Sequence, residues 1–174
     1  MNNNDGKNNS GSKSIAVYPG TFDPVTNGHL DIIKRALNIF DGVIVVIARN
    51  PDKKQFFTLE ERLKMVRDCF GPDEDRVKVA HTSGLLVDFV SQNGAKAIIR
   101  GLRAVSDFEH EFQLALMNRK IMRKVDTVFL MTGLRWIYIS SSIIKDVARH
   151  GGDVGGMVPL HVAELLNRRF AEQD

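Results

Sequence analysis

The loop at residues 18–29 carries side chains suited to binding phosphate. It reads Tyr-Pro-Gly-Thr-Phe-Asp-Pro-Val-Thr-Asn-Gly-His and joins a short apolar run to an amphipathic segment with helical spacing. A helix N-terminus favours phosphate because it offers free N–H groups and the positive end of the helix dipole. Gly28 allows an anion to approach closely, and His29 would place an imidazole donor beside it. A turn ending in an ordinary hydrogen-bonded histidine is the simpler interpretation of a Gly-His pair alone, but the surrounding pattern favours phosphate binding.

A second candidate phosphate site is the run Ile139-Ser140-Ser141-Ser142, which opens another predicted helix. One serine suffices to cap a helix N-terminus. Three in a row leave hydroxyl and N–H groups that we expect to face a polyphosphate.

Basic residues follow two of the predicted strands. Lys53 and Lys54 come after the second strand, and Arg100 and Arg103 come after the fourth. In an open α/β sheet, ligands bind outside the carboxyl ends of the strands, where these cations and both loops would meet. A solvated surface position is an equally good interpretation of Lys54.

Strands and helices alternate along the chain, as in a repeated βα unit. Apolar runs predict strands at 15–18, 43–48, 76–80, 96–99 and 126–131, and helical spacing predicts helices at 28–40, 58–70, 84–93, 107–123, 140–150 and after Pro159. Thr58-Leu59-Glu60-Glu61 has the pattern of a capping box. Such units form a parallel sheet covered on both faces. We therefore expect an α/β fold: one Rossmann-like domain with a five-stranded parallel sheet and helices on both faces.

The composition is typical of a single globular domain. The chain has 174 residues, of which 43% are hydrophobic, enough to bury one sizeable core. Residues 1–13 are polar, so we expect a disordered leader there and a domain over residues 14–174. Because no apolar run reaches the length of about 18 residues that a membrane helix needs, no membrane partner is expected.

The charge and the aromatic content of the chain argue against a nucleic-acid partner. The net charge is +3, and no run of five like charges occurs. The pI of about 9.1 raises the alternative of an RNA-binding domain, which would interleave aromatic residues on a basic face. Aromatic residues make up only 7% of the chain, so no nucleic-acid partner is expected.

The single cysteine, Cys69, is interpreted as a small core or half-buried residue of a cytoplasmic protein. No metal-ligand spacing is present, so no protein metal site is expected.

Thr26-Asn27-Gly28-His29 resembles the T/H-x-G-H signature of the nucleotidyltransferase superfamily, and the longer run 18–29 resembles the bacterial phosphopantetheine adenylyltransferase family. The similarity covers the chain from about Ser14 to its C-terminus. It continues, in the family's order and spacing, through Pro51-Asp52-Lys53-Lys54, Phe57-Thr58-Leu59-Glu60-Glu61-Arg62, Arg100-Gly101-Leu102-Arg103-Ala104, Asp107-Phe108-Glu109 and Ile139-Ser140-Ser141-Ser142. The chain departs from the family's pattern at His110 and at residues 133–135.

This resemblance implies an enzyme of coenzyme A biosynthesis that transfers the adenylyl group of ATP to 4′-phosphopantetheine, giving dephospho-CoA and pyrophosphate. The acceptor is a phosphomonoester, whose second pKa of about 6 makes it largely a dianion at neutral pH. It therefore needs positioning and relief of charge repulsion rather than an activated side-chain nucleophile. The implied reaction is a direct in-line attack without a covalent enzyme intermediate.

Residue roles follow from the resemblance. His29 would stabilise the transition state, with Lys53 and Arg100 as further catalytic residues. The acceptor would contact Thr21, Lys53, Leu86 and Arg100. ATP would contact Thr21, Phe22, His29, Gly101, Leu102, Arg103, Glu111, Trp136, Ile137, Tyr138, Ile139, Ser140, Ser141 and Ser142. Mg²⁺ bound to ATP, CoA as a feedback ligand and a homohexameric assembly are also implied.

Two alternative functions share these features. A sister nucleotidyltransferase acting on nicotinamide mononucleotide or a cytidylyl substrate would use the same two phosphate sites, although Arg100-Gly101-Leu102-Arg103 argues against it. A non-catalytic nucleotide sensor would keep the fold but would have no need of Thr21, His29, Lys53 and Arg100 together.

Overall fold

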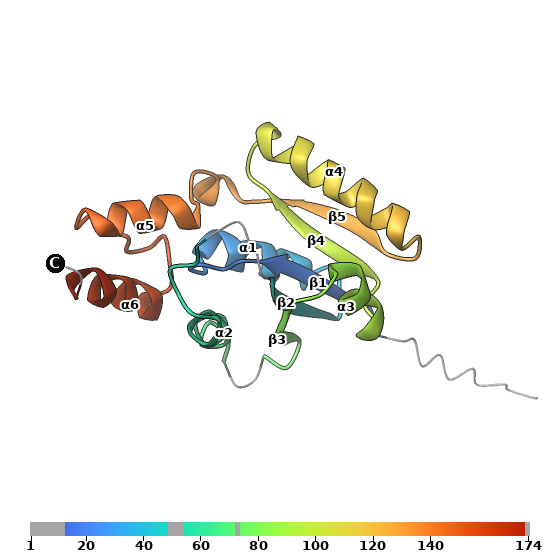
Figure 1. Ribbon diagram of the computed structural model, residues 1–174, viewed down its shortest axis with the longest axis horizontal. Coiled ribbons are helices and arrows are strands. Elements are labelled where there is room, and N and C mark those ends of the chain that lie inside the picture. Colours follow the sequence, from blue (N-terminus) through green and yellow to red (C-terminus); the bar gives the residue numbers. More distant parts are fainter. Residues whose placement is uncertain (1–12, 49–53, 72–73, 173–174) are drawn as a thin grey trace, which may run out of the picture.

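The computed structural model describes residues 13–48, 54–71 and 74–172 (Figure 1). Within them the strands form one sheet. They are β1 (Ile15–Gly20), β2 (Gly42–Ala48), β3 (Val77–Thr82), β4 (Ala97–Leu102) and β5 (Asp126–Met131). The spatial order is β3-β2-β1-β4-β5, and every neighbouring pair is parallel. The predicted five-stranded parallel sheet is confirmed. The expected leader at residues 1–13 falls almost entirely outside the described residues.

The helices lie close to their predicted positions and are mostly shorter. They are α1 (Asn27–Ala36), α2 (Leu59–Arg67), α3 (Leu86–Gln92), α4 (Val105–Ile121), α5 (Ser141–Arg149) and α6 (Leu160–Ala171), with a short 3₁₀ turn, η1 (Leu134–Trp136), before α5. The predicted capping box at Thr58 begins α2, with the Thr58 and Glu61 side chains each bonded to the other residue's N–H.

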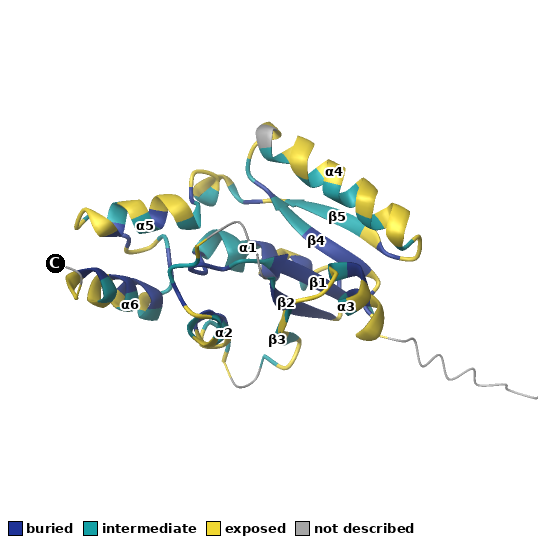
Figure 2. Ribbon diagram, viewed as in Figure 1, coloured by how far each residue is buried: buried dark blue, intermediate teal, exposed yellow. Residues whose placement is uncertain are grey.

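Both faces of the sheet are covered, as predicted. Along β2, Val43, Val45 and Ile47 pack into a cluster with buried residues of α1, α2, α5 and α6. The alternate residues Ile44 and Val46 pack into a second cluster with buried residues of α3. Successive side chains of a strand point to opposite faces, so this alternation places helices on each side. Figure 2 shows the buried strands at the centre and a largely exposed α4 beside β4 and β5.

β1 and β4 are hydrogen-bonded neighbours only at their beginnings. The register pairs Ala16 with Ala97 and Val17 with Ile98, although β1 runs on to Gly20 and β4 to Leu102. The strand order reverses here, since β2 and β3 lie on one side of β1 while β4 and β5 lie on the other. Ligands of open α/β sheets bind at such a reversal.

The ends of these two strands differ from the sequence prediction. Pro19 and Gly20, expected to follow the first strand, continue β1 beside β2. Arg100 and Gly101, expected to follow the fourth strand, lie within β4 and pair with β5. Because β4 does not pair with β1 beyond Val17, the missing N–H of Pro19 breaks no ladder on that side.

Candidate active site

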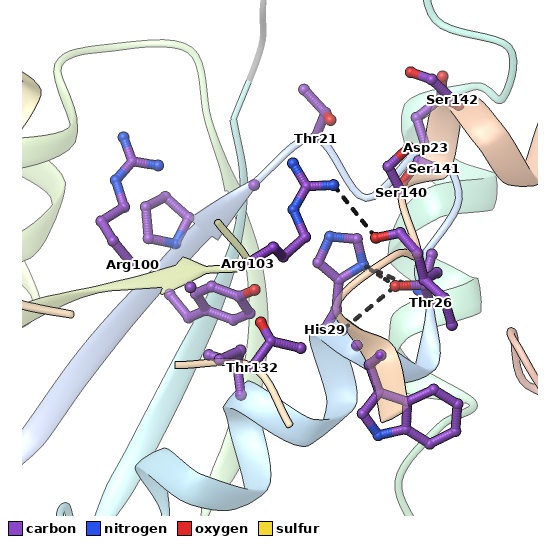
Figure 3. Close-up of a pocket in the computed structure, with 18 of the residues that line it drawn as sticks. Thr21, Asp23, Thr26, His29, Arg100, Arg103, Thr132, Ser140, Ser141 and Ser142 are labelled. Carbon is purple, nitrogen blue, oxygen red and sulfur yellow. Dashed lines mark hydrogen bonds between the residues drawn. The ribbon is translucent and has the colours of Figure 1, made fainter. Parts of the chain in front are cut away.

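A pocket of about 360 Å³ opens where β1 and β4 separate. Its lining comes mainly from the end of β1, the loop at residues 21–26, the end of β4 and the N-termini of α1 and α5, with further residues from α4, η1 and the segment before α2. Figure 3 shows Ser140, Ser141 and Ser142 on one side of this space and Arg100 on the other, with His29 and Arg103 between them. The two predicted phosphate loops and the two arginines therefore meet in one cavity.

Thr26 and His29 form a capping box at the N-terminus of α1. The backbone N–H of Thr26 donates to Nδ1 of His29 at 3.0 Å, and the Thr26 hydroxyl lies 3.0 Å from the same nitrogen. The Thr26 hydroxyl oxygen also accepts the N–H of His29 at 3.4 Å. Because Nδ1 accepts a backbone hydrogen bond, a neutral ring carries its proton on Nε2. That nitrogen lies on the side of Arg103 (Figure 3).

The His29 imidazole is neutral at physiological pH. Burial, together with the nearby positive charge of Arg103, lowers the pKa of His29 from 6.5 to about 4. The side chain therefore offers a fixed, uncharged N–H donor to the pocket.

Aromatic rings support the imidazole. The Phe22 ring meets the His29 ring edge to face, with centroids 5.0 Å apart, and meets the Tyr18 ring at 5.6 Å. Phe22 has a left-handed φ of 46°, which is uncommon outside glycine. Its ring lies over Gly20, where a Cβ would come within 2.9 Å of ring carbons. Gly20 thus makes room for Phe22, which holds His29 in place.

The fold itself uses two of the three serine hydroxyls. Ser140 caps α5, its hydroxyl accepting the N–H of Ile143 at 3.2 Å. The Ser141 hydroxyl donates to the Pro24 carbonyl at 2.8 Å and ties α5 to the first loop. Within the described residues, the Ser142 hydroxyl and the N–H groups of Ser141 and Ser142 have no hydrogen-bond partner. The sequence suggested two free hydroxyls; the structure leaves one, together with two N–H groups.

Arg100 and Glu111 lie next to one another in the pocket. Nε of Arg100 is 2.8 Å from Oε2 of Glu111, and the two side chains are 19% and 21% exposed. The Glu111 oxygen receives no well-directed N–H, so the contact is an ion pair more than a hydrogen bond. Pairing through Nε leaves the terminal nitrogens of Arg100 for an anion, the arrangement suited to bidentate phosphate binding.

Arg103 bridges the end of β4 and the start of α5. Its Nε donates to Asp107 at 3.1 Å, while Nη1 donates to the Ile139 carbonyl at 3.3 Å (Figure 3). Nearby, burial raises the pKa of Tyr18 well above its usual value of 10, so the phenol keeps its proton.

Asp23 and Lys145 line the pocket, although no role was assigned to them from the sequence. The Asp23 carboxylate is buried, and it accepts the N–H groups of Phe56 and Phe57 at 2.9 Å each. The Lys145 ammonium donates to it at 2.7 Å. Asp23 belongs to the first motif, but a motif does not reveal which of its residues has buried partners.

Arg62 supports Thr21 from α2. Its buried guanidinium donates to the Thr21 carbonyl at 3.0 Å. Lys54 lines the pocket, and its ammonium makes no ion pair within the part of the chain that the structure describes. Lys53 lies outside the described residues, so its role stays a prediction.

The remaining predicted residues divide into groups. Ile137 and Tyr138 are 38% and 61% exposed, Phe22 and Leu102 are buried, and Leu86 packs with the α3 cluster without lining the pocket. Those that line the pocket are Thr21, His29, Arg100, Gly101, Arg103, Glu111, Trp136, Ile139, Ser140, Ser141 and Ser142.

Two kinds of feature are absent from residues 13–48, 54–71 and 74–172. No group of three or more His, Cys, Asp or Glu side chains there could hold a metal ion. No helix there has both the length and the apolar character needed to cross a membrane.

Comparisons with known proteins place the chain in a family. The family described as cytidylyltransferase-like matches residues 17–147. A phosphopantetheine adenylyltransferase of Desulfotalea psychrophila is 60% identical over 158 residues, covering 90% of this chain and 93% of that protein. One from Syntrophus aciditrophicus is 53% identical over 161 residues, covering 92% and 94%.

Solved structures confirm the fold at low sequence identity. A protein of Vibrio parahaemolyticus described as a candidate nicotinate-nucleotide adenylyltransferase superposes with a TM-score of 0.68 at 20% identity, covering 94% of this chain and 98% of that one. Since relatives more than half identical span almost the full length, the chain belongs to the phosphopantetheine adenylyltransferase family.

Proposed function

We propose that this enzyme transfers the adenylyl group of ATP to 4′-phosphopantetheine by direct in-line attack, releasing dephospho-CoA and pyrophosphate in coenzyme A biosynthesis. One observation carries the mechanism: the N-termini of α1 and α5 open into the pocket that Arg100 and Lys54 also line. Neither helix has an acidic residue in its first turn. The pocket therefore presents two positive helix ends to anionic substrates.

The reaction forms one bond and breaks one. An oxygen of the acceptor phosphate bonds to the α-phosphorus of ATP, and the bond from that phosphorus to the β-phosphate oxygen breaks, so that pyrophosphate leaves. In this proposal the Nε2–H of His29 donates to an α-phosphate oxygen as charge develops there. Ser142 and the free N–H groups of α5 bind the triphosphate, and Thr21, Lys53 and Arg100 hold the acceptor phosphate.

Direct transfer needs no covalent intermediate, and the single cysteine is poorly suited to form one. Positioning alone can supply roughly 7–11 kcal/mol of a reaction barrier. Burial raises the pKa of the Cys69 thiol to about 12, and Cys69 does not line the pocket. Its thiol is therefore a poor nucleophile.

Mg²⁺ would enter with ATP and screen the charge of the triphosphate. The carboxylates among the described pocket residues, Asp23 and Glu111, are each paired with a cation. Ligands from phosphate and water, which Mg²⁺ commonly keeps, fit this arrangement better than a protein cage.

A homohexamer, a cytoplasmic location and feedback binding of CoA are proposed from the family resemblance. Exposed apolar side chains on α4 support self-association, because apolar surface of this extent is usually covered by a partner. They are Val105, Phe108, Phe112, Leu116, Met117 and Ile121. Sedimentation velocity of the wild-type chain and a Phe112→Glu variant tests this: the proposal expects a six-subunit species that the variant weakens, and a monomeric wild type would contradict it.

The experiment that tests the function measures pyrophosphate release with three substrate pairs, two of which contain MgATP. The proposal expects release with 4′-phosphopantetheine, but none with nicotinamide mononucleotide or when CTP and glycerol phosphate replace both substrates. Release with one of the other pairs would assign a different substrate to the same site. No release with any would favour the nucleotide sensor.

A further inference from the structure

The Asp23 carboxylate joins three separate segments of the pocket wall. Its side chain is 7% exposed. Oδ2 accepts the N–H of Phe56 at 2.9 Å and the ammonium of Lys145 at 2.7 Å, while Oδ1 accepts the N–H of Phe57 at 2.9 Å. The first loop, the segment before α2 and helix α5 therefore share one buried group.

Each of these segments contributes residues to the pocket, and the first loop and α5 also carry residues that the proposed function assigns to phosphate binding. Asp23 lies between Thr21 and the cap of α1. Phe56 comes shortly after Lys54, and Lys145 lies one turn along α5 from Ser141. The contacts of Asp23 thus set the distance between the residues proposed to bind the acceptor phosphate and those proposed to bind the triphosphate.

A second bond reinforces the same connection. The Ser141 hydroxyl donates to the carbonyl of Pro24, the residue after Asp23. This bond and the Lys145 ion pair both join α5 to the first loop, one at the start of the helix and one a turn later. None of the described residues that Asp23 contacts belongs to a strand. The strands of the sheet therefore pair without the Asp23–Lys145 ion pair and without the bonds from Asp23 to Phe56 and Phe57.

We propose that Asp23 is a positioning residue for adenylyl transfer. It acts through Lys145 and through the backbone of Phe56 and Phe57, which it holds against the first loop. This inference rests on the proposed function. Its physical basis is that a misplacement of about 1 Å can reduce the rate of a positioned reaction about 10²-fold.

Three variants separate the contacts of Asp23. Asp23→Asn puts an amide NH₂ where donors now converge, so at least one backbone N–H of Phe56 or Phe57, or the ammonium of Lys145, loses its acceptor. Lys145→Met removes the ammonium but leaves the bonds to Phe56 and Phe57. Lys145→Arg keeps a cation beside the carboxylate. Asp68→Asn, in the exposed pair with Lys64, is the matched control.

We expect kcat to fall about 10²-fold in Asp23→Asn and about tenfold in Lys145→Met. Lys145→Arg should recover most of the loss, and Asp68→Asn should match the wild type. KM for ATP and for phosphopantetheine should change less than kcat, because the protein residues that bind the phosphates remain present but are misplaced. In the double variant of Asp23→Asn and Lys145→Met, the loss of kcat should be close to that of Asp23→Asn alone, since both substitutions disrupt the same Asp23–Lys145 contact.

Thermal unfolding of every variant, followed by circular dichroism, shows whether the protein is folded at the assay temperature. A purely structural role would lower Tm while folded protein kept the wild-type kcat, and that result would overturn the proposal. If Asp23→Asn does not fold, an unchanged kcat in Lys145→Met would overturn it equally. A wild-type chain that releases no pyrophosphate would instead remove the proposed function, so the two failures are distinguishable.

Discussion

The backbone N–H of Thr26 donates to Nδ1 of His29 at 3.0 Å, and this one bond decides what the histidine can do. It fixes the orientation of the ring and leaves the proton of the neutral imidazole on Nε2. The same pair caps α1, so the helix end that favours phosphate and the donor beside it are set by one local structure. The Phe22 ring, 5.0 Å away, limits movement of the imidazole.

His29→Ala should lower kcat by about 10²–10³-fold, the usual effect of removing one donor to developing charge. His29→Gln separates the capping role of His29 from its donor role, because glutamine at this position can form a capping box without supplying the imidazole donor. We expect its helix cap to be restored and its turnover to stay low in a pyrophosphate-release assay. Near-normal turnover in His29→Ala would remove His29 from the mechanism.

The stability of the protein should depend on pH through His29. Its pKa of about 4 in the folded chain lies below the unfolded value of 6.5, so between these values the unfolded chain binds more protons. Stability from this group is complete above pH 6.5 and is lost as the pH falls toward 4, by an amount on the order of 3 kcal/mol. Urea unfolding of wild type and His29→Gln at several pH values measures it. An NMR titration midpoint of His29 near 6.5 would contradict the account.

The two threonine capping boxes provide a matched comparison. Thr26→Ala and Thr58→Ala each remove a helix cap, and each should destabilise the protein by about 1 kcal/mol. Only Thr26→Ala should also reduce turnover, because the Thr26 hydroxyl lies 3.0 Å from Nδ1 of His29 and its loss leaves the imidazole held by the backbone N–H alone. Equal kinetic losses in both variants would mean that general destabilisation, and not the orientation of the imidazole, reduces the rate.

The serine run should separate stability from ATP binding. Ser140→Ala removes the cap of α5 and should cost about 1 kcal/mol in unfolding free energy. Ser142→Ala removes an exposed hydroxyl and should leave the unfolding free energy unchanged while raising KM for ATP. Denaturant unfolding and steady-state kinetics on both variants test the contrast. A Ser142→Ala enzyme with an unchanged KM would restrict the proposed triphosphate contacts to the backbone N–H groups of the helix.

Much of the fold could be predicted from local patterns. The alternation of apolar runs and helical spacing gave the parallel sheet, because each βα unit must bury both faces of its strand. The ends of the strands were harder to predict. Arg100 and Gly101 resemble loop residues by type, yet they pair with β5 because that edge of β4 remains available. Pairing with a partner strand is a non-local property that the composition of one segment does not show.

The site was predictable where chemistry is local and less so where it depends on partners. The start of a helix near Gly28 and the serine start of α5 follow from short motifs, whereas the Thr26–His29 capping box appears only in the structure. The family resemblance assigns Arg100 to the acceptor and Glu111 to the nucleotide. Their pairing joins β4 to α4 and cannot be predicted from either segment alone. The same holds for Asp23 and Lys145, which are 122 residues apart in the chain.

The most direct test of the mechanism is the stereochemical course of transfer from a single diastereomer of ATP carrying sulfur on the α-phosphorus. One in-line displacement inverts the configuration at that phosphorus, so the account predicts a dephospho-CoA analogue of inverted configuration when 4′-phosphopantetheine is the acceptor. Retention would require two displacements and hence an enzyme-bound adenylyl group, which would contradict the direct transfer proposed here.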